Sequence, residues 1–329
     1  MSKICIHIGT HKTATTHIQT LFEKNAALLG RNGVIVPRLT PEKRHHPLAG
    51  VWNKGFGEDP TAARALWHKL ASDHARSDRT VFVSSEELSR LRPITSRVDM
   101  AEMRSLVAAF DEVILLCTFR NQAGFIQSIY QQVSSSRGAE TWDPFLKTAL
   151  REKSCDGLSL NYDRLYSHFL TGFARNEVRL LSYDRESITT AGMAGAVLRE
   201  IGCTLDPAKL RPVSPEVSNV SAPPLVTFAA NQLCPSDPAS PALYALIQTQ
   251  IDHSYGPGKR TTLFTPTEVA QITESFTASN AALKQRIAYC QPEFEIGAML
   301  PQGADLYRDK LNKAFWIALA QRLALSSSI

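Results

Sequence analysis

The chain has 329 residues, 43% of them hydrophobic, and a net charge of +5. This composition can bury a large core. Because no apolar run is long enough for a bilayer and the small charge requires no nucleic acid, we expect neither a membrane span nor a nucleic-acid partner. The six cysteines form no C-x-x-C pair and indicate reduced thiols, and the N-terminal residues enter a strand with no signal-peptide pattern, which favours a cytoplasmic protein.

Residues 4–8 predict a buried strand, and the turn that follows it predicts an anion site. The turn, residues 9–16, holds one Gly and one Lys and runs into a helical pattern. A helix start exposes unpaired N–H groups at the positive end of its dipole, so a phosphate is favoured there. Lys12 adds a positive charge. Three threonines add hydroxyl donors: Thr13, Thr15 and Thr16.

This loop is shorter than the P-loop of nucleoside triphosphatases, G-x-x-x-x-G-K-[ST]. The chain has G-x-x-K-T from Gly9 to Thr13, with no Gly before the Lys. A loop of this length suits one phosphate group better than a triphosphate with its magnesium.

Residues 37–60 form the first long irregular stretch and are rich in Pro, His and Gly. A polar, aromatic loop of this length beside an anion site is where an acceptor would be received. His45 and His46 in this loop are candidate proton acceptors, and the alternative is that both are plain surface residues.

The predicted strand 80–84 leads into two glutamates. Ser84 and Glu87 have the spacing of a capping box, so Glu87 is expected to serve the start of a helix. Glu86 is then free to act as a base. His46 competes with Glu86 for this role, and the sequence leaves the choice open.

The predicted strand 112–118 ends at a second anion-binding candidate. Arg120 follows the strand, and Ser128 lies on the polar side of the next helical pattern, so the two side chains are expected to grip one phosphate together. The alternative is a salt bridge at the strand end and an incidental helix serine.

The order of these elements predicts an α/β fold. Strands near 4–8, 80–84, 112–118 and 177–182, each followed by a helical pattern, indicate a P-loop-like parallel sheet flanked by helices on both faces. Its loops gather at the carboxyl ends of the strands, where such sheets bind ligands. We expect a single domain over 1–329 with a mainly helical, loop-rich C-terminal part over 205–329. A final amphipathic helix from Leu306 to Leu323 is expected to pack on the core or on a second subunit, in a homodimer.

Residues 9–19 resemble the 5′-phosphosulfate loop of the sulfotransferases, roughly G-x-x-K-[ST]-G-[ST]-T. The eight-residue step from Arg120 to Ser128 matches the 3′-phosphate site of that family. The resemblance implies transfer of sulfonate from 3′-phosphoadenosine 5′-phosphosulfate to an alcohol or amine, on a small-molecule, glycan or lipid acceptor. One departure is Ala14, where many members have Gly. We expect helical φ at Ala14, in the first turn of the helix, so that Ala is harmless there.

The resemblance also implies roles for individual residues. His11 is expected to support the phosphosulfate. Lys259 and Arg260, near a Gly-Pro-Gly turn, either fold over the 3′-phosphate or form an exposed basic turn. Glu86, or alternatively His46, takes the proton of the acceptor, while Lys12 stabilises charge on the leaving 5′-phosphate. No metal is expected, because this leaving group carries a single phosphate that Lys12 and the helix start neutralise.

Two other functions fit parts of the pattern. A P-loop kinase acting on a small alcohol or nucleoside would need a full Walker loop and a magnesium-binding Asp at a strand end, and neither is visible. A non-catalytic adenosine-bisphosphate-binding protein would keep Lys12, Arg120 and Ser128 without a base facing the sulfur. The acceptor itself is not specified by the sequence.

Overall fold

The computed structural model describes residues 1–39, 45–53, 59–91, 97–137, 141–213, 222–234, 237–300 and 303–326. The chain divides into two compact units. Unit 1 comprises Met1–Asn121, Gly157–Ser218 and Ala278–Gly297, and unit 2 comprises Gln122–Asp156, Asn219–Thr277 and Ala298–Ile329. The single-domain organisation expected from the sequence stays a prediction.

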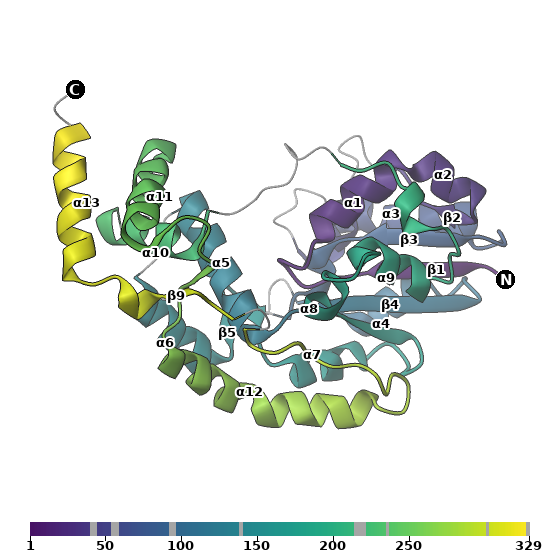
Figure 1. The fold of residues 1–329 in the computed structure, drawn as a ribbon. Coiled ribbons are helices and arrows are strands. Elements are labelled where there is room, and N and C mark those ends of the chain that lie inside the picture. The colour runs from purple at the N-terminus through teal and green to yellow at the C-terminus, as the bar shows by residue number, and fades with distance from the viewer. Residues whose placement is uncertain are drawn as a thin grey trace. The chain divides into compact units, whose positions relative to one another are not determined.

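Unit 1 is built on a five-stranded sheet in the order β2-β3-β1-β4-β7, with every neighbouring pair parallel (Figure 1). Four of its strands were expected from buried apolar runs: β1 (Lys3–His7), β3 (Thr80–Ser84), β4 (Glu112–Phe119) and β7 (Val178–Ser182). The fifth, β2 (Val34–Ile35), was not expected, because two residues are too short to show a period.

Helices cover both faces of this sheet (Figure 1). Alternate side chains of a strand point to opposite faces, so Ile4 and Ile6 join one apolar cluster and Cys5 the other. The first cluster includes side chains of α3 (Pro60–His74), α4 (Met100–Leu106) and α7 (Tyr162–Phe169). The second includes side chains of α1 (Thr15–Lys24), α2 (Ala26–Arg31) and α9 (Gly192–Glu200). The α/β fold class with a parallel sheet between two helical layers is therefore confirmed.

Unit 2 is mainly helical. Its helices are α5 (Gln122–Arg137), α6 (Trp142–Glu152), α10 (Pro224–Leu233), α11 (Pro241–Tyr255) and α13 (Lys313–Ser326), together with the first part of α12 (Pro266–Ile287). Aromatic rings fill its interior, with Trp142 at 5.1 Å from both Tyr130 and Phe264, centroid to centroid. None of the described helices combines the length and apolar character that crossing a membrane requires.

Several short elements complete the chain. The strand β5 (Ser154–Cys155) belongs to unit 2 and β6 (Leu158–Ser159) to unit 1. Within unit 2, β8 (Thr261–Thr262) and β9 (Leu306–Tyr307) form a small parallel sheet. The final helix was predicted from Leu306, and this start is wrong. Leu306 pairs with Thr261 in a parallel ladder, and the helix begins only at Lys313.

The edge strand β7 is protected by one side chain. Oε1 of Gln291 accepts a hydrogen bond from the backbone N–H of Leu180 (2.8 Å), and Nε2 of Gln291 donates one to the Leu180 carbonyl (3.0 Å). It thus takes the place that a neighbouring strand would occupy. Unpaired groups on an edge strand are a template for association, and this side chain removes them at Leu180.

Replacing Gln291 with alanine should therefore lower the free energy of unfolding by roughly 1–3 kcal/mol, because a partly buried N–H and C=O both lose their partner. Urea denaturation measures this change. Gln132→Ala on the exposed side of α5 is the matched control and should cost less than about 0.5 kcal/mol. Equal effects of the two substitutions would contradict the role given to Gln291.

Candidate functional site

The loop after β1 is fastened to the neighbouring strand β4. Ile8 and Thr10 donate their backbone N–H groups to the carbonyls of Leu116 and Thr118 at 2.8 and 3.0 Å. The hydroxyls of Thr10 and Thr13 donate to the carbonyls of Thr118 (2.9 Å) and Thr10 (2.6 Å). Because the hydroxyl hydrogen of Thr13 is used inside the loop, this residue shapes the loop rather than offering a donor to a ligand.

The backbone of the loop is left-handed at three residues, with φ of 32° at Gly9, 63° at Lys12 and 63° at Ala14. The expectation of helical φ at Ala14 is wrong: Ala14 is the N-cap of α1, with ψ of 18°. The chain passes from strand to helix within a few residues, and left-handed residues accomplish this reversal. Such turns direct successive N–H groups into one concavity, which is a common way for proteins to bind anions.

The left-handed conformation at Ala14 predicts a stabilising substitution. An L-residue pays roughly 1–2 kcal/mol in this region and glycine does not, so Ala14→Gly should raise the free energy of unfolding by about 1 kcal/mol. Ala65→Gly, at an exposed position inside α3, should lower it by about 1 kcal/mol, because there the helix favours alanine. Urea unfolding of both variants gives the comparison, and a loss of stability in Ala14→Gly would exclude strain at this position.

Lys12 and Arg120 lie in contact at the carboxyl edge of the sheet. Nη1 of Arg120 donates to the backbone carbonyl of Lys12 at 3.4 Å. Burial, and then the charge of Arg120, lower the pKa of Lys12 from its usual value. No described carboxylate contributes to that shift or pairs with either cation. Two adjacent cations without an acidic partner form a site for anionic groups.

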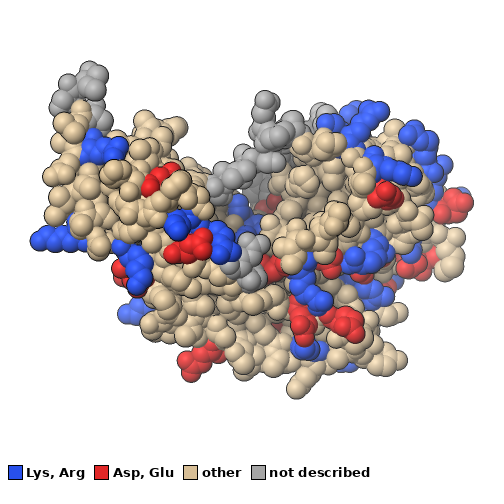
Figure 2. Space-filling model, viewed as in Figure 1, with Lys and Arg blue, Asp and Glu red and all other residues tan. Residues whose placement is uncertain are grey.

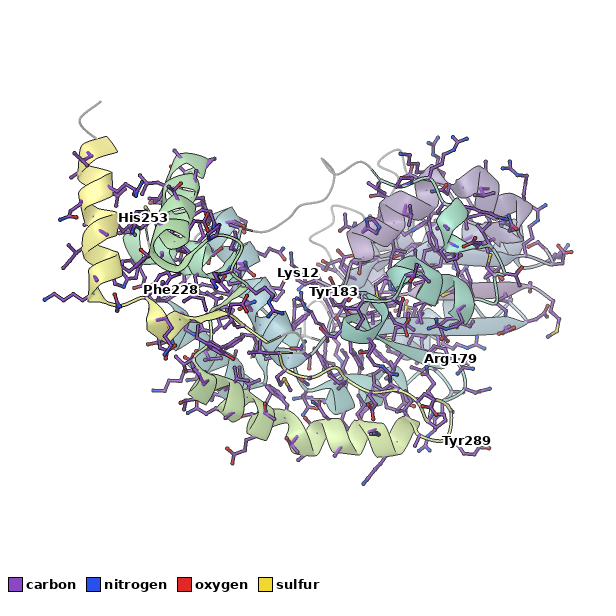
Figure 3. All side chains as sticks on the ribbon, in the orientation of Figure 1. Lys12, Arg179, Tyr183, Phe228, His253 and Tyr289 are labelled. Carbon is purple, nitrogen blue, oxygen red and sulfur yellow. The ribbon has the colours of Figure 1, made fainter. Side chains whose placement is uncertain are left out.

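The end of β7 holds Arg120 in place. The guanidinium lies over the ring of Tyr183, 5.0 Å from its centroid, and the Arg120 carbonyl accepts the hydroxyl of Tyr162 at 2.6 Å. The next residue, Asn121, donates its backbone and side-chain N–H groups to Asp184 at 2.6 and 2.8 Å. Arg120 therefore contacts both Lys12 and Tyr183, which are labelled in Figure 3. No site role was predicted for Tyr183 and Asp184, although both directly follow a predicted strand.

Three buried polar atoms of this region have no hydrogen-bond partner within the described ranges: Nδ1 of His11, Oγ1 of Thr15 and Nε of Arg120. A Cβ at Gly9 would lie 2.4 Å from Oγ1 of Thr15, so only glycine leaves room for that hydroxyl. Thr15 and Arg120 can donate to a phosphate oxygen, and unsatisfied buried donors of this kind fit an anionic ligand.

Glu87 does not cap a helix, contrary to the expectation. The short 3₁₀ helix Glu86–Ser89 has Ser85 as its N-cap, and no side chain caps it. The carboxylate of Glu87 instead accepts hydrogen bonds from His11 (Nε2 to Oε1, 2.9 Å) and Arg90. Burial raises the pKa of Glu87, but these two partners outweigh it and hold the pKa at about 2. The charged guanidinium of Arg90 binds a carboxylate more strongly than a neutral N–H does, which is why the local capping signal fails here.

The other candidate bases have partners of different kinds. Glu86 accepts a hydrogen bond from Nε2 of Gln19 at 3.4 Å, and Nδ1 of His46 lies 2.8 Å from the hydroxyl of Ser85. His45 is buried, with Nε2 3.0 Å from the Pro37 carbonyl, and Nδ1 accepts the backbone N–H of Ser84 at 3.1 Å. Both nitrogens of His45 are occupied, so this histidine is structural.

Three buried histidines predict a loss of stability in mild acid. Burial lowers the pKa of His7, His45 and His168 from the usual 6.5 to about 4. Between these pH values the unfolded chain binds protons that the folded chain does not. Stability should therefore fall as pH falls from 6.5 towards 4, by up to about 1.4 kcal/mol per pH unit for each histidine. Urea unfolding at pH 7 and pH 5 tests this, and equal stability at both would contradict it.

The remaining predicted site residues are spread over both units. Thr16 is exposed at the start of α1. Ser128 on α5 is buried, and Arg260 pairs with Asp305 at 3.0 Å, next to Lys259; all four belong to unit 2. The approach of Ser128, Lys259 and Arg260 to Lys12 stays a prediction. Of the acceptor loop expected over 37–60, residues 40–44 and 54–58 lie outside the described residues.

The sheet and the anion loop at its carboxyl edge define a P-loop-like α/β fold. No family model matches the chain, and no curated protein matches its sequence. Among solved structures, the chain is similar to a sulfotransferase from Alicyclobacillus acidocaldarius, with 14% sequence identity and a TM-score of 0.49. The similarity covers 86% of this chain and 94% of that one.

Proposed function

We propose that this chain is a sulfotransferase that moves a sulfonate group from 3′-phosphoadenosine 5′-phosphosulfate to a hydroxyl or amine acceptor. The observation that carries the proposal is the contact between Lys12 and Arg120 at the carboxyl edge of the sheet, without an acidic partner among the described residues. Two neighbouring cations suit the phosphate groups of one small nucleotide, and the short loop beside them suits a single 5′-phosphate.

In this proposal the loop surrounds the 5′-phosphosulfate. Lys12 supplies charge, Thr15 and Thr16 supply hydroxyls, and the backbone N–H groups from Thr13 to Thr16 line the concavity. His11 lies in the same loop. Arg120 holds the 3′-phosphate together with Ser128, and Lys259 and Arg260 close over it.

The reaction is an in-line transfer. A base, for which the sequence offers Glu86 or His46, takes the proton of the acceptor as its oxygen or nitrogen attacks sulfur. Lys12 and the loop amides stabilise the charge that grows on the bridging oxygen of the leaving 5′-phosphate. A leaving group with one phosphate is neutralised by these groups, so the mechanism needs no metal.

The acceptor is proposed to be a small molecule, a glycan or a lipid, handled in the cytoplasm by a protein that forms a homodimer. On the face drawn in Figure 2, Lys and Arg side chains are interspersed with Asp and Glu side chains.

Calorimetry tests the nucleotide specificity. Adenosine 3′,5′-bisphosphate should bind, and ATP with magnesium should bind much more weakly; the reverse order would favour a kinase. Transfer of radiolabelled sulfonate to a panel of alcohols, phenols and amines then separates an enzyme from a non-catalytic binding protein.

A further inference from the structure

We propose that His11, held by Glu87, is the group that takes the proton from the acceptor; this inference rests on the proposed function and assigns to His11 the role offered to Glu86 or His46. It comes from a cluster of titratable side chains at the ends of two neighbouring strands. His11 lies on the loop after β1, and Glu87 and Arg90 follow β3.

The cluster fixes the orientation of the imidazole. Nε2 of His11 lies 2.9 Å from Oε1 of Glu87, and the two side chains are only 12% and 9% exposed. Arg90 and Asn53 also donate to this carboxylate, the latter at 3.4 Å, so Glu87 is itself held on several sides. A histidine anchored in this way cannot rotate freely. A proton acceptor needs such a fixed orientation.

The same contact fixes the tautomer. Glu87 stays ionised at neutral pH because its pKa is held at about 2, and an ionised carboxylate only accepts hydrogen bonds. The hydrogen of the neutral ring must therefore be on Nε2, which leaves a lone pair on Nδ1. This is the arrangement by which a carboxylate orients a histidine base in other enzymes.

Nδ1 is ready to accept a proton. It is shielded from solvent and has no hydrogen-bond partner in the described part of the chain. A buried acceptor without a partner is costly, so a hydroxyl donor that enters the site would satisfy it.

The loop separates two functions on its two sides. The backbone carbonyl of Lys12 contacts Arg120, which follows β4, while His11 contacts Glu87, which follows β3. Because β1 lies between β3 and β4 in the sheet, the nucleotide contacts lie on one side of the loop and the proton acceptor on the other. Among the other candidates, His45 has both nitrogens occupied, and Nδ1 of His46 lies 2.8 Å from the hydroxyl of Ser85. Glu86 is already bonded by Gln19.

The acceptor oxygen forms a bond to sulfur while the bond from sulfur to the bridging oxygen of the 5′-phosphate breaks and leaves its electron pair on that oxygen. The acceptor proton moves to Nδ1 of His11, and the imidazolium later releases it to water. Nothing is oxidised or reduced, and Lys12 neutralises the leaving oxygen.

The first test needs no acceptor. Long-range proton–nitrogen NMR of the histidine rings reports the tautomer, and the signals lost in His11→Gln identify His11 among the nine histidines. We expect the Nε2–H tautomer in the wild type. The Nδ1–H tautomer would overturn the inference.

The second test compares two acceptors. In His11→Gln the amide can still donate to Glu87, but the basic nitrogen is gone. Transfer to an aliphatic alcohol should fall by ~10²- to 10⁴-fold, while transfer to 2,4-dinitrophenol, which is already ionised at neutral pH, should fall less than about tenfold. Equal losses with both acceptors, or a loss confined to Glu86→Gln, would overturn the assignment.

The third test concerns Glu87 as a positioning residue. Glu87→Gln should lower kcat/KM for the alcohol by ~10²-fold or more, and it should displace the acid limb of the profile of kcat/KM against pH. In His11→Gln this acid limb should be absent. A purely structural role would leave the shape of the profile unchanged, and that result would overturn the inference.

Binding of adenosine 3′,5′-bisphosphate distinguishes this inference from the proposed function. All these variants should bind it within about threefold of the wild type, since proton transfer is not part of binding. If the wild type fails to bind the nucleotide or to transfer sulfonate to any acceptor, the proposed function and this inference both fall. If it binds and transfers but His11→Gln is as active as wild type with the alcohol, only the inference falls.

Discussion

Lys12→Ala is expected to lower kcat for sulfonate transfer by ~10²-fold or more, because a charge aimed at the leaving oxygen acts mainly in the transition state. Lys12 already has left-handed φ, and alanine pays the same backbone cost there, so the substitution removes the ammonium group without changing the strain of the loop. Burial and the charge of Arg120 lower the pKa of Lys12, which means that they destabilise its charged form. A bound anion would stabilise that form.

Single-turnover transfer of labelled sulfonate measures this loss, and Lys24→Ala at the exposed end of α1 is the matched control. Lys24 donates to the Pro212 carbonyl and should affect the rate less than about twofold. Activity of Lys12→Ala within a few-fold of the wild type would contradict its role in the reaction.

Arg120→Ala is expected to weaken binding of adenosine 3′,5′-bisphosphate by roughly 10- to 100-fold, the usual loss for a charge-assisted hydrogen bond. Adenosine 5′-monophosphate lacks the 3′-phosphate, so its affinity should change less than about threefold in the same variant. Lys12→Ala should weaken both ligands, because both keep the 5′-phosphate. The pair of ligands thus separates the two cations by the phosphate that each one holds.

Calorimetry with both nucleotides gives the affinities of the wild type, Arg120→Ala and Lys12→Ala for each of them. Tyr183→Leu removes the ring below the guanidinium and should produce a smaller loss, less than about tenfold, for the bisphosphate alone. Arg31→Ala, at the exposed end of α2, is the control for a general change of charge. Equal losses of affinity for the two nucleotides in Arg120→Ala would show that Arg120 does not bind the 3′-phosphate.

The parts of the fold that depend on local apolar runs could be predicted from the sequence. Strands buried on both faces are nearly continuous runs of Val, Ile and Leu, and β1, β3, β4 and β7 were found in this way. The order of the strands then placed Lys12 and Arg120 at one edge, since the carboxyl ends of parallel strands meet there.

The errors share a physical cause: the competing partner lies far away in the chain. The capping-box spacing of Ser84 and Glu87 is a local signal, while His11, which binds Glu87, is 76 residues distant. The left-handed φ of Ala14 depends on how the loop is tied to β4, more than a hundred residues further along. Asp184 escaped notice because its target, Asn121, is not its neighbour in sequence.

The clamp of Gln291 on β7 has a consequence for biogenesis. Leu180 and Gln291 are 111 positions apart, so during synthesis the strand emerges from the ribosome long before the residue that shields it. A nascent chain, or one truncated ahead of residue 291, presents the bare central amide and carbonyl of that strand. We expect chaperone dependence and misassembly to be concentrated in this interval, and to end when the last segment of unit 1 has docked.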